Sequence, residues 1–541
     1  MKKVLLIIFS IFLWISGIGY TQQISKHSIK YKPEDWISYP VMRFVTCIDQ
    51  GDEYIYFGTT RGVCRYQFYK EEWDTPYTRS NGMNNDRISI VYYDFTTGNL
   101  WCATEIGLSY RIPTTGEWYN INYPGNIRGG VSDLGSGERF LWLKKGKSYY
   151  QGDKFGSMFS RSDKASALED NIRWSSEGMV NNLPYFFMND ENFIYDPEGY
   201  IKRLDLREYR ITYAFKDNFR SIWIGTDGLG CGVGDIRTER LSILPFGPYH
   251  SDVQTMAWDG YTMWIGGQSG RNKGAITWWD QKENRWEYFE ARYVSVLRSD
   301  DVNDILVERD TSLVWFATGD GLVSYNKKTD TWKVYDSFDN LWDDYITSLA
   351  KTGDTLWIGT AAGINEMYEG IIKKANIKSL GKRMIYRLAS DNKNLWAGTD
   401  KGKYFFYAEK KKWHYMKGAP NVLNLDINAI DVYNDEVWFA GEDGVEMYNI
   451  KNKKWQGYPA DHYPLPGNIN SILNTDDIVW IASENGLIKF VKKEDRWRRF
   501  TVEDGLLHNS IRWIIPDGDY IWLGSPNGIT QFYWNAPYRI D

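Results

Sequence analysis

Polar side chains that could bind a ligand stand just ahead of short β-strand patterns at many points in this sequence. If those strands line a common channel, the residues at their entrances converge on one ligand. A funnel of carboxylate, amide, guanidinium and phenol groups would hydrogen-bond a carbohydrate, a peptide or a partner loop. The same Asn and Asp side chains could instead bond only to their own turns. The candidate ligand-binding residues are Asn85, Arg87, Asp252, Asp301, Asp344, Tyr345, Asn468, Asn509 and Arg512.

Paired carboxylates are the feature that would favour an enzyme. Adjacent pairs occur at Asp300–Asp301, Asp343–Asp344 and Asp476–Asp477. A lyase or glycoside hydrolase acting on polysaccharide needs two carboxylates that face each other, whereas neighbours in a strand point to opposite faces. No HExxH or GxSxG motif and no His cluster with metal-ligand spacing is present. We therefore expect no catalytic residue, no metal site and no cofactor, and keep the polysaccharide enzyme as the alternative.

Composition narrows the choice of partner. The chain has 541 residues, a formal net charge of −6 and only five His, and this slight acidity gives no electrostatic footprint for nucleic acid. Its length is enough for two large domains. The four cysteines are too scattered for a disulfide framework and form no CxxC pair. We expect free thiols in the core, with a bridge from Cys47 to Cys64 or Cys102 left open.

A repeat sets the elements that must position the candidate residues. The stretch Leu356–Ile364, which reads LWIGTAAGI, recurs in near-copies along almost the whole chain. The later copies are centred on tryptophans 39 to 42 residues apart. Such a steady period marks a repeat architecture. Twelve aromatic centres follow, with a decayed copy inferred near 186: residues 56, 101, 142, 186, 223, 264, 315, 357, 396, 438, 480 and 522.

Each repeat is expected to form a four-stranded antiparallel blade. One copy contains four short runs rich in branched and aromatic residues, at 427–433, 436–440, 444–448 and 454–458, with turn residues between them. A lone blade would leave both faces wet, so it needs a neighbour on each side. A ring of blades meets that need, and a Gly or Ala after the aromatic pair lets blades converge. We therefore predict an all-β fold of β-propeller type.

The two chain ends supply parts of one blade. Residues 35–39 match the last strand of a repeat but precede any complete copy, while the final repeat ends after its third strand. An early strand that completes the last blade would close a ring and remove a free sheet edge. Twelve blades exceed the usual four to eight of one ring. We expect two β-propellers, at 35–294 and 295–541, while a seven-plus-five split, an inserted ring and a single larger ring stay open.

The first residues have a different character. Lys2 and Lys3 precede an apolar run over 4–18, and polar residues follow. This order resembles a secretory signal peptide over residues 1–22, and the run is short for a membrane span. We expect the mature chain to be exported, to the periplasm or beyond the cell, and to have no transmembrane segment.

The repeat pattern W-[IF]-G-T-x-x-G-[LI]-x-x-[YF] resembles the two-component regulator propeller repeat. The best matches are 315–325, 357–368, 438–448 and 480–490, and a following turn such as 503–511 also fits. The resemblance covers roughly residues 35–540 and implies a stand-alone relative of the sensor region of hybrid histidine kinases. Because the sequence reaches Asp541 without a kinase, we expect a non-enzymatic module that binds an extracellular ligand, such as a carbohydrate, or a protein partner in the envelope.

Overall fold

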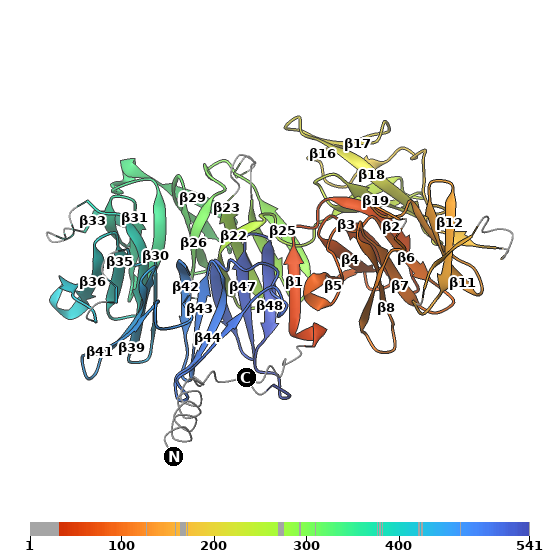
Figure 1. Ribbon diagram of the computed structural model, residues 1–541. Helices are drawn as coiled ribbons and strands as arrows, with labels where there is room; N and C mark the ends of the chain where they lie inside the picture. The colour runs from red at the N-terminus through yellow and green to blue at the C-terminus, as the bar shows by residue number, and fades with distance from the viewer. Residues whose placement is uncertain are drawn as a thin grey trace, which may run out of the picture. The chain divides into compact units, whose positions relative to one another are not determined.

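The fold is built from strands. The computed structural model describes residues 32–539 except 126, 157, 163–168, 170, 269–274, 292, 293, 309, 376, 378, 379, 381, 420, 421, 424, 425 and 466. In this part of the chain the elements are β-strands and a few 3-10 turns, without an α-helix (Figure 1). The all-β propeller class is therefore confirmed. No helix among these residues is long and apolar enough to span a membrane, and the expected signal peptide, 1–22, lies outside them.

Residues 45–244 form four sheets. Most neighbouring strands in these sheets are consecutive in the sequence and are joined by hairpins. Their strands are β2 (Val45–Gln50), β3 (Tyr54–Thr59), β4 (Gly62–Gln67) and β5 (Glu72–Tyr77); β6 (Ile90–Asp94), β7 (Asn99–Ala103), β8 (Gly107–Arg111) and β9 (Trp118–Asn122); β10 (Asp133–Ser136), β11 (Phe140–Lys145), β12 (Ser148–Asp153), β13 (Ser160–Ser162) and β14 (Arg173–Trp174); and β15 (Phe187–Met188), β16 (Phe193–Asp196), β17 (Tyr200–Arg203), β18 (Glu208–Lys216), β19 (Ser221–Thr226), β20 (Cys231–Asp235) and β21 (Arg240–Leu244).

Seven further four-stranded sheets follow, and the last of them takes β1 from the start of the chain. Their strands are β22 (Asp252–Asp259), β23 (Thr262–Gln268), β24 (Ile276–Asp280) and β25 (Arg285–Phe289); β26 (Val302–Glu308), β27 (Leu313–Thr318), β28 (Gly321–Asn326) and β29 (Thr331–Tyr335); β30 (Ile346–Thr352), β31 (Thr355–Thr360), β32 (Gly363–Tyr368) and β33 (Ile371–Lys374); β34 (Ile385–Ser390), β35 (Leu395–Thr399), β36 (Gly402–Tyr407) and β37 (Lys412–Met416); β38 (Ala429–Tyr433), β39 (Glu436–Gly441), β40 (Gly444–Asn449) and β41 (Lys454–Pro459); β42 (Ile469–Asn474), β43 (Ile478–Ser483), β44 (Gly486–Val491) and β45 (Arg496–Phe500); and β1 (Trp36–Pro40) with β46 (Trp513–Asp517), β47 (Tyr520–Ser525) and β48 (Gly528–Tyr533).

The expected closure by the chain ends is confirmed. Strand β1 pairs antiparallel with β48 and places Trp36 opposite Phe532. The two rings stack with centroids 3.7 Å apart and planes 3° from parallel. In Figure 1 the red β1 lies beside the blue β48. This pairing gives the final sheet its fourth strand and covers the edge of β48.

Small residues after the aromatic centre let successive sheets approach. A Cβ added to Gly359 would lie 2.9 Å from Ile385 of the next sheet, and one on Gly398 would lie 2.4 Å from the Ile427 carbonyl. The same kind of contact closes two separate rings of sheets, and each closed ring is called a circuit below. Gly225 would meet Val45 at 2.3 Å, so the four early sheets return on themselves. Gly524 would meet Val253 at 3.0 Å, so the seven later sheets do the same.

The first circuit has an irregular step between its third and fourth sheets. Strand β14 pairs with β10, and a few residues later Met179 forms a β-bridge with Phe215 on β18. The repeat expected near residue 186 has no sheet of its own. Instead β15 pairs with the outer strand β21, and the β16–β17 hairpin extends β18. There are consequently eleven sheets in the described residues, one fewer than the twelve centres expected.

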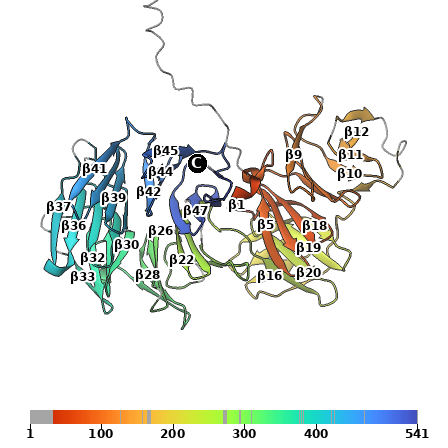
Figure 2. The same cartoon turned by 90° about the horizontal axis from the view of Figure 1, so that it is seen from below.

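These contacts favour a division of the chain different from the boundary near residue 295. Inner strand β22 packs against both β26 and β46, which places its sheet among the later ones. Figure 2 shows this green sheet beside the blue β47. We therefore propose that the seven-sheet circuit contains β1 and residues 252–533, and that residues 45–244 are inserted into it after β1. An inserted ring is one of the alternatives that the sequence leaves open.

The core consists mainly of the repeat aromatics. Trp101, Trp396 and Trp438 are each at most 1% exposed, as the expectation of a sheet-to-sheet core requires. The four cysteines are buried and free. One charged pair is also buried: Lys403 on β36 donates to Glu446 on β40 at 2.5 Å, and Glu446 also accepts the Leu423 N–H at 2.9 Å. Burial lowers the Lys403 pKa although Glu446 opposes that shift.

Candidate functional site

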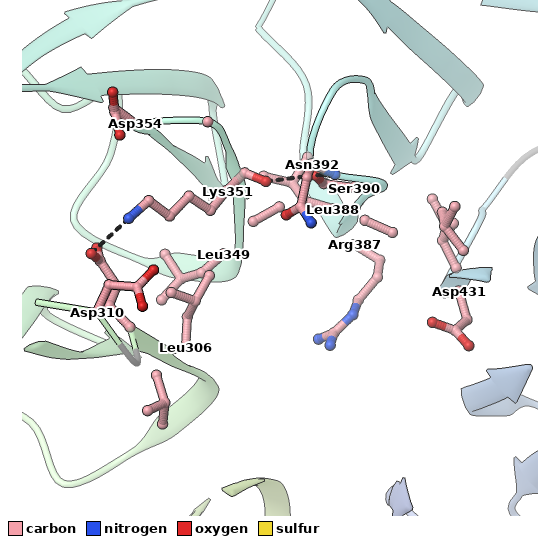
Figure 3. A pocket seen from close by; sticks show the side chains of 17 residues that line it. Leu306, Asp310, Leu349, Lys351, Asp354, Arg387, Leu388, Ser390, Asn392 and Asp431 are labelled. Carbon is pink, nitrogen blue, oxygen red and sulfur yellow. Dashed lines mark hydrogen bonds and ion pairs between the residues drawn. The ribbon is translucent and has the colours of Figure 1, made fainter. Parts of the chain in front are cut away.

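The best candidate site is a cavity of about 690 Å³ at the end of the seven-sheet channel. It is lined by the last residues of the inner strands β26, β30, β34 and β38 and by the turns that follow them. Inner strands carry side chains alternately into the channel and into the sheet packing. The cavity wall therefore combines aliphatic residues with charged ones (Figure 3). Its size is within the range of small-molecule sites.

Arg387 is held at the centre of this cavity by two contacts. Its guanidinium lies 4.0 Å from the ring centroid of Trp513, and Nη1 is 3.4 Å from the Asp304 carboxylate. Trp513 belongs to β46, which is separated from β34 by β38 and β42 in the circuit, so this contact crosses the channel. Figure 3 shows the Arg387 side chain extending away from the ribbon of its strand. Stacking and ion pairing fix the guanidinium before a ligand arrives.

Lys351 is committed to a neighbouring carboxylate. Its ammonium donates to Glu308 at 2.7 Å, and the Trp315 indole donates to the other Glu308 oxygen at 2.7 Å. Burial alone would raise the Glu308 pKa, but the hydrogen bonds from Lys351, Thr311 and Trp315 outweigh it and lower the pKa. Glu308 therefore stays ionised, and its ion pair with Lys351 forms a fixed part of the cavity wall.

Other polar groups of the cavity are available to a ligand. Among the residues that the structure describes, the side chains of Asp310, Asp354 and Asn392 make no hydrogen bond, and Asp310 and Asp354 are exposed. Asp431 accepts the Asn474 N–H at 2.6 Å, and burial raises its pKa against the opposing charge of Arg387. The cavity can thus accept hydrogen bonds through carboxylates and donate them through one pre-placed guanidinium.

None of the nine residues predicted from the sequence lines this cavity. They lie just before the inner strands or, for Asp252, at the first residue of one, whereas the cavity lies where inner strands end. Two of them accept a backbone N–H seven residues earlier: Asp344 from Ser337 at 2.6 Å and Asn509 from Val502 at 2.9 Å. Asn85 accepts the N–H of Arg87 at 3.0 Å. These side chains stabilise their own turns, as the alternative interpretation proposed.

Three more of the predicted residues share one backbone role. The carbonyls of Asp301, Tyr345 and Asn468 each accept, at 3.1 Å, an N–H that follows the second strand of the same sheet. Asp252 and Arg512 are brought together across the closure of the circuit, with Nε 3.5 Å from Oδ1. This ion pair links the first and last sheets. A ligand site at this end of the channel stays a prediction.

In a second cavity, of about 530 Å³, the arginines of the lining are bound to other groups of the protein. Arg43 stacks over Tyr249 and donates to the carbonyls of Gly228 and Tyr249, both at 3.0 Å. The Glu290 carboxylate forms ion pairs with Nη1 of Arg203 at 2.5 Å and with Nη2 of Arg207 at 2.7 Å. These internal pairs hold residues 43, 203–249 and 290 together. The channel cavity is therefore the better candidate for a ligand.

Comparison with known proteins follows from this geometry. No protein-family model matches the chain, and no curated protein matches its sequence. Among solved structures, PorZ, described as an essential bacterial surface component of the type-IX secretion system of human oral-microbiomic Porphyromonas gingivalis, is 13% identical with a TM-score of 0.54, over 92% of this chain and 87% of PorZ. The shared feature is the fold.

Two further neighbours are less similar in structure. The extracellular domain of BT4673 from B. thetaiotaomicron, described as a hybrid two component system, is 17% identical with a TM-score of 0.47, over 92% of this chain and 71% of that one. Virginiamycin B lyase from Staphylococcus aureus is 14% identical with a TM-score of 0.43, over 53% of this chain and 96% of that one.

Proposed function

We propose that this chain is an exported, non-catalytic binding module whose ligand is a small polar molecule held in the channel cavity. The observation that carries the proposal is Arg387, fixed by Trp513 and Asp304 with its guanidinium facing a cavity of about 690 Å³. The exposed carboxylates of Asp310 and Asp354 complement it as hydrogen-bond acceptors. Export is supported by the sequence of residues 1–22.

A ligand in this position would bridge sheets that are not neighbours. Arg387 on β34 already contacts Trp513 on β46, and Asp304 lies on β26. A molecule that bonds to Arg387 and to Asp354 or Asp310 would therefore join several inner strands through one site. A ligand bound there would contact several sheets of the circuit at once. Such a site suits a sensor or an assembly module whose partner lies outside this chain.

The proposal is tested by thermal-shift screening of the mature protein against amino acids, dipeptides and mono- to trisaccharides, followed by calorimetric titration of each hit. Loss of a hydrogen bond to a charged group costs about 1.5–3 kcal/mol, so Arg387→Ala should weaken binding by roughly ten- to a hundredfold. Asn392→Ala, at the rim, should weaken it less. Arg237→Ala is the matched control, since Arg237 is exposed and lies outside the cavity.

Three outcomes would contradict the proposal. One is the absence of any hit in the screen, and another is a hit whose affinity Arg387→Ala leaves unchanged while the protein stays folded. A third is chemical conversion of a hit, detected by chromatography of the reaction mixture. A non-catalytic module releases its ligand unaltered. Turnover of a saccharide would favour the polysaccharide enzyme instead.

A further inference from the structure

One hairpin tip of the first circuit carries aromatic side chains where two sheets of the second circuit carry lysines. The turn between the third and fourth strands reads Lys327–Asp330 (KKTD) after β28 and Lys492–Asp495 (KKED) after β44, which is ordinary polar turn chemistry. The corresponding turn after β4 reads Phe68–Glu71 (FYKE). Tyr69 is 66% exposed there.

A second aromatic tip meets the first. Phe219, in the turn between β18 and β19, is 52% exposed. Its ring centroid lies 5.3 Å from that of Phe68 and 6.1 Å from that of Tyr69, and the Phe68 and Tyr69 rings are 4.4 Å apart. The ring planes are inclined to one another by 43° to 71°. Single exposed aromatics are common, whereas three in mutual contact form a concave platform.

The platform stands over a cavity of about 420 Å³. Asp217 fixes one side of it, because its carboxylate accepts the N–H groups of Phe219 and Ser221 at 2.8 Å each and the Trp223 indole N–H at 2.9 Å. The turn that carries Phe219 is therefore held in place by Asp217, both of whose carboxylate oxygens accept hydrogen bonds. The floor is formed by Trp223 and Leu244.

The lining specifies the chemistry of the occupant. Its polar members are the hydroxyls of Tyr66, Tyr69, Ser221 and Ser242 and the carboxylates of Glu71 and Asp217, and it contains no basic side chain. Aromatic faces pack on the C–H face of a sugar ring, while hydroxyl and carboxylate groups bond to its hydroxyls. An anionic ligand would meet the carboxylates of Glu71 and Asp217 in this lining.

We propose that the Phe68–Tyr69–Phe219 platform and the cavity beneath it bind an uncharged polysaccharide. This site lies in the first circuit, apart from the channel cavity of the second, and its occupancy does not depend on the function proposed above. Tyr69 and Phe219 contact the sugar by stacking, and Glu71 accepts hydrogen bonds from its hydroxyls. Asp217 acts as a positioning residue that holds the Phe219 tip.

The experiment is native affinity electrophoresis of the full mature protein in gels containing hydroxyethylcellulose, dextran or yeast mannan, with polygalacturonate as the anionic comparator. We expect retardation by at least one of the neutral polymers and none by polygalacturonate. Tyr69→Ala and Phe219→Ala should each weaken the retardation at least tenfold, and Phe219→Tyr should retain it. Arg387→Ala, in the channel cavity, should bind the polymer as the parent protein does.

Tyr261→Ala is the matched control. Tyr261 is 76% exposed at the tip between β22 and β23, the turn that corresponds to that of Phe219, and it does not line this cavity. Its removal should leave retardation unchanged. The proposal is overturned by no retardation in any neutral polymer, by equal retardation in polygalacturonate, or by Tyr69→Ala and Phe219→Ala variants that bind as well as the parent. Capture of a protein partner through the platform, without polymer binding, would also overturn it.

Discussion

Replacing Glu446 by Gln should destabilise the seven-sheet circuit by about 3 kcal/mol. Lys403 and Glu446 are 2% and 0% exposed, so the lysine would be left charged and without its counter-ion in the core. Breaking such a pair typically costs about 3–5 kcal/mol. The lower end applies because Gln can still accept the Leu423 N–H and because the Lys403 pKa is already lowered by burial.

The assay is urea unfolding followed by tryptophan fluorescence, with the change in free energy taken from the midpoint shift. The deficit of Glu446→Gln should shrink as pH rises above neutrality, because an unpaired Lys403 is stable in its neutral form. The double variant Lys403→Met/Glu446→Gln should recover most of the loss. Lys451→Ala, which removes an exposed ion pair with Asp435 in the next hairpin, is the control and should have no measurable effect.

Two results would refute this reasoning. A deficit below about 1 kcal/mol in Glu446→Gln would mean that solvent reaches the pair, contrary to its burial. A double variant as unstable as the single one would mean that the loss in Glu446→Gln does not come from an unpaired Lys403.

Three further predictions concern the core. Trp36→Ala should destabilise the protein by about 3–5 kcal/mol and promote aggregation, because it removes the ring stacked on Phe532 and loosens the strand that covers β48. Urea unfolding measures the stability and light scattering the aggregation. Unchanged stability would contradict closure by β1. His250 is buried, its Nε2 accepts the Ala275 N–H at 3.2 Å, and burial lowers its pKa from 6.5 to about 4. The unfolded chain therefore binds the extra proton between these values, so stability should fall by up to about 3 kcal/mol as pH drops from 6.5 to 4, and a His250→Gln variant should show a flatter melting-temperature profile over that range; an identical profile would rule out His250 as the cause. Thiol reagents should label the native protein negligibly and the urea-unfolded protein at four sites, Cys47, Cys64, Cys102 and Cys231, since all four are buried and free; rapid native labelling would contradict that burial.

Local repetition made the sheets predictable. The motif at Leu356–Ile364 places a buried Trp, a close-packed Gly and a turn in a fixed order, and each feature has a short-range cause. The strand at 36–40 could be recognised as an outer strand because its sequence matches the fourth strand of other repeats. Residues 185–202 could not, since their strands pair with a neighbouring sheet and form none of their own.

The circuits and the site depend on contacts that no local pattern contains. All inner strands have similar sequences, so only the contacts Gly225–Val45 and Gly524–Val253 reveal which sheet follows which. Arg387 contacts Trp513 across the channel, and the local sequence around either residue does not predict this contact. The sequence signal for this cavity is the charge at inner-strand ends, as in Lys351 and Asp431, which lie at the ends opposite to the predicted residues.

The pairing of β1 with β48 also fixes an order of events during synthesis. Strand β1 is made before the other strands of both circuits, whereas its partner β48 is made after them. All four sheets of the inserted segment can fold in the meantime, because every strand they need precedes residue 245. The seven-sheet circuit keeps an open end until β48 has been made. A chain that stops short of β48 would therefore carry one finished circuit and one with two unpaired edges, which marks it for aggregation or proteolysis.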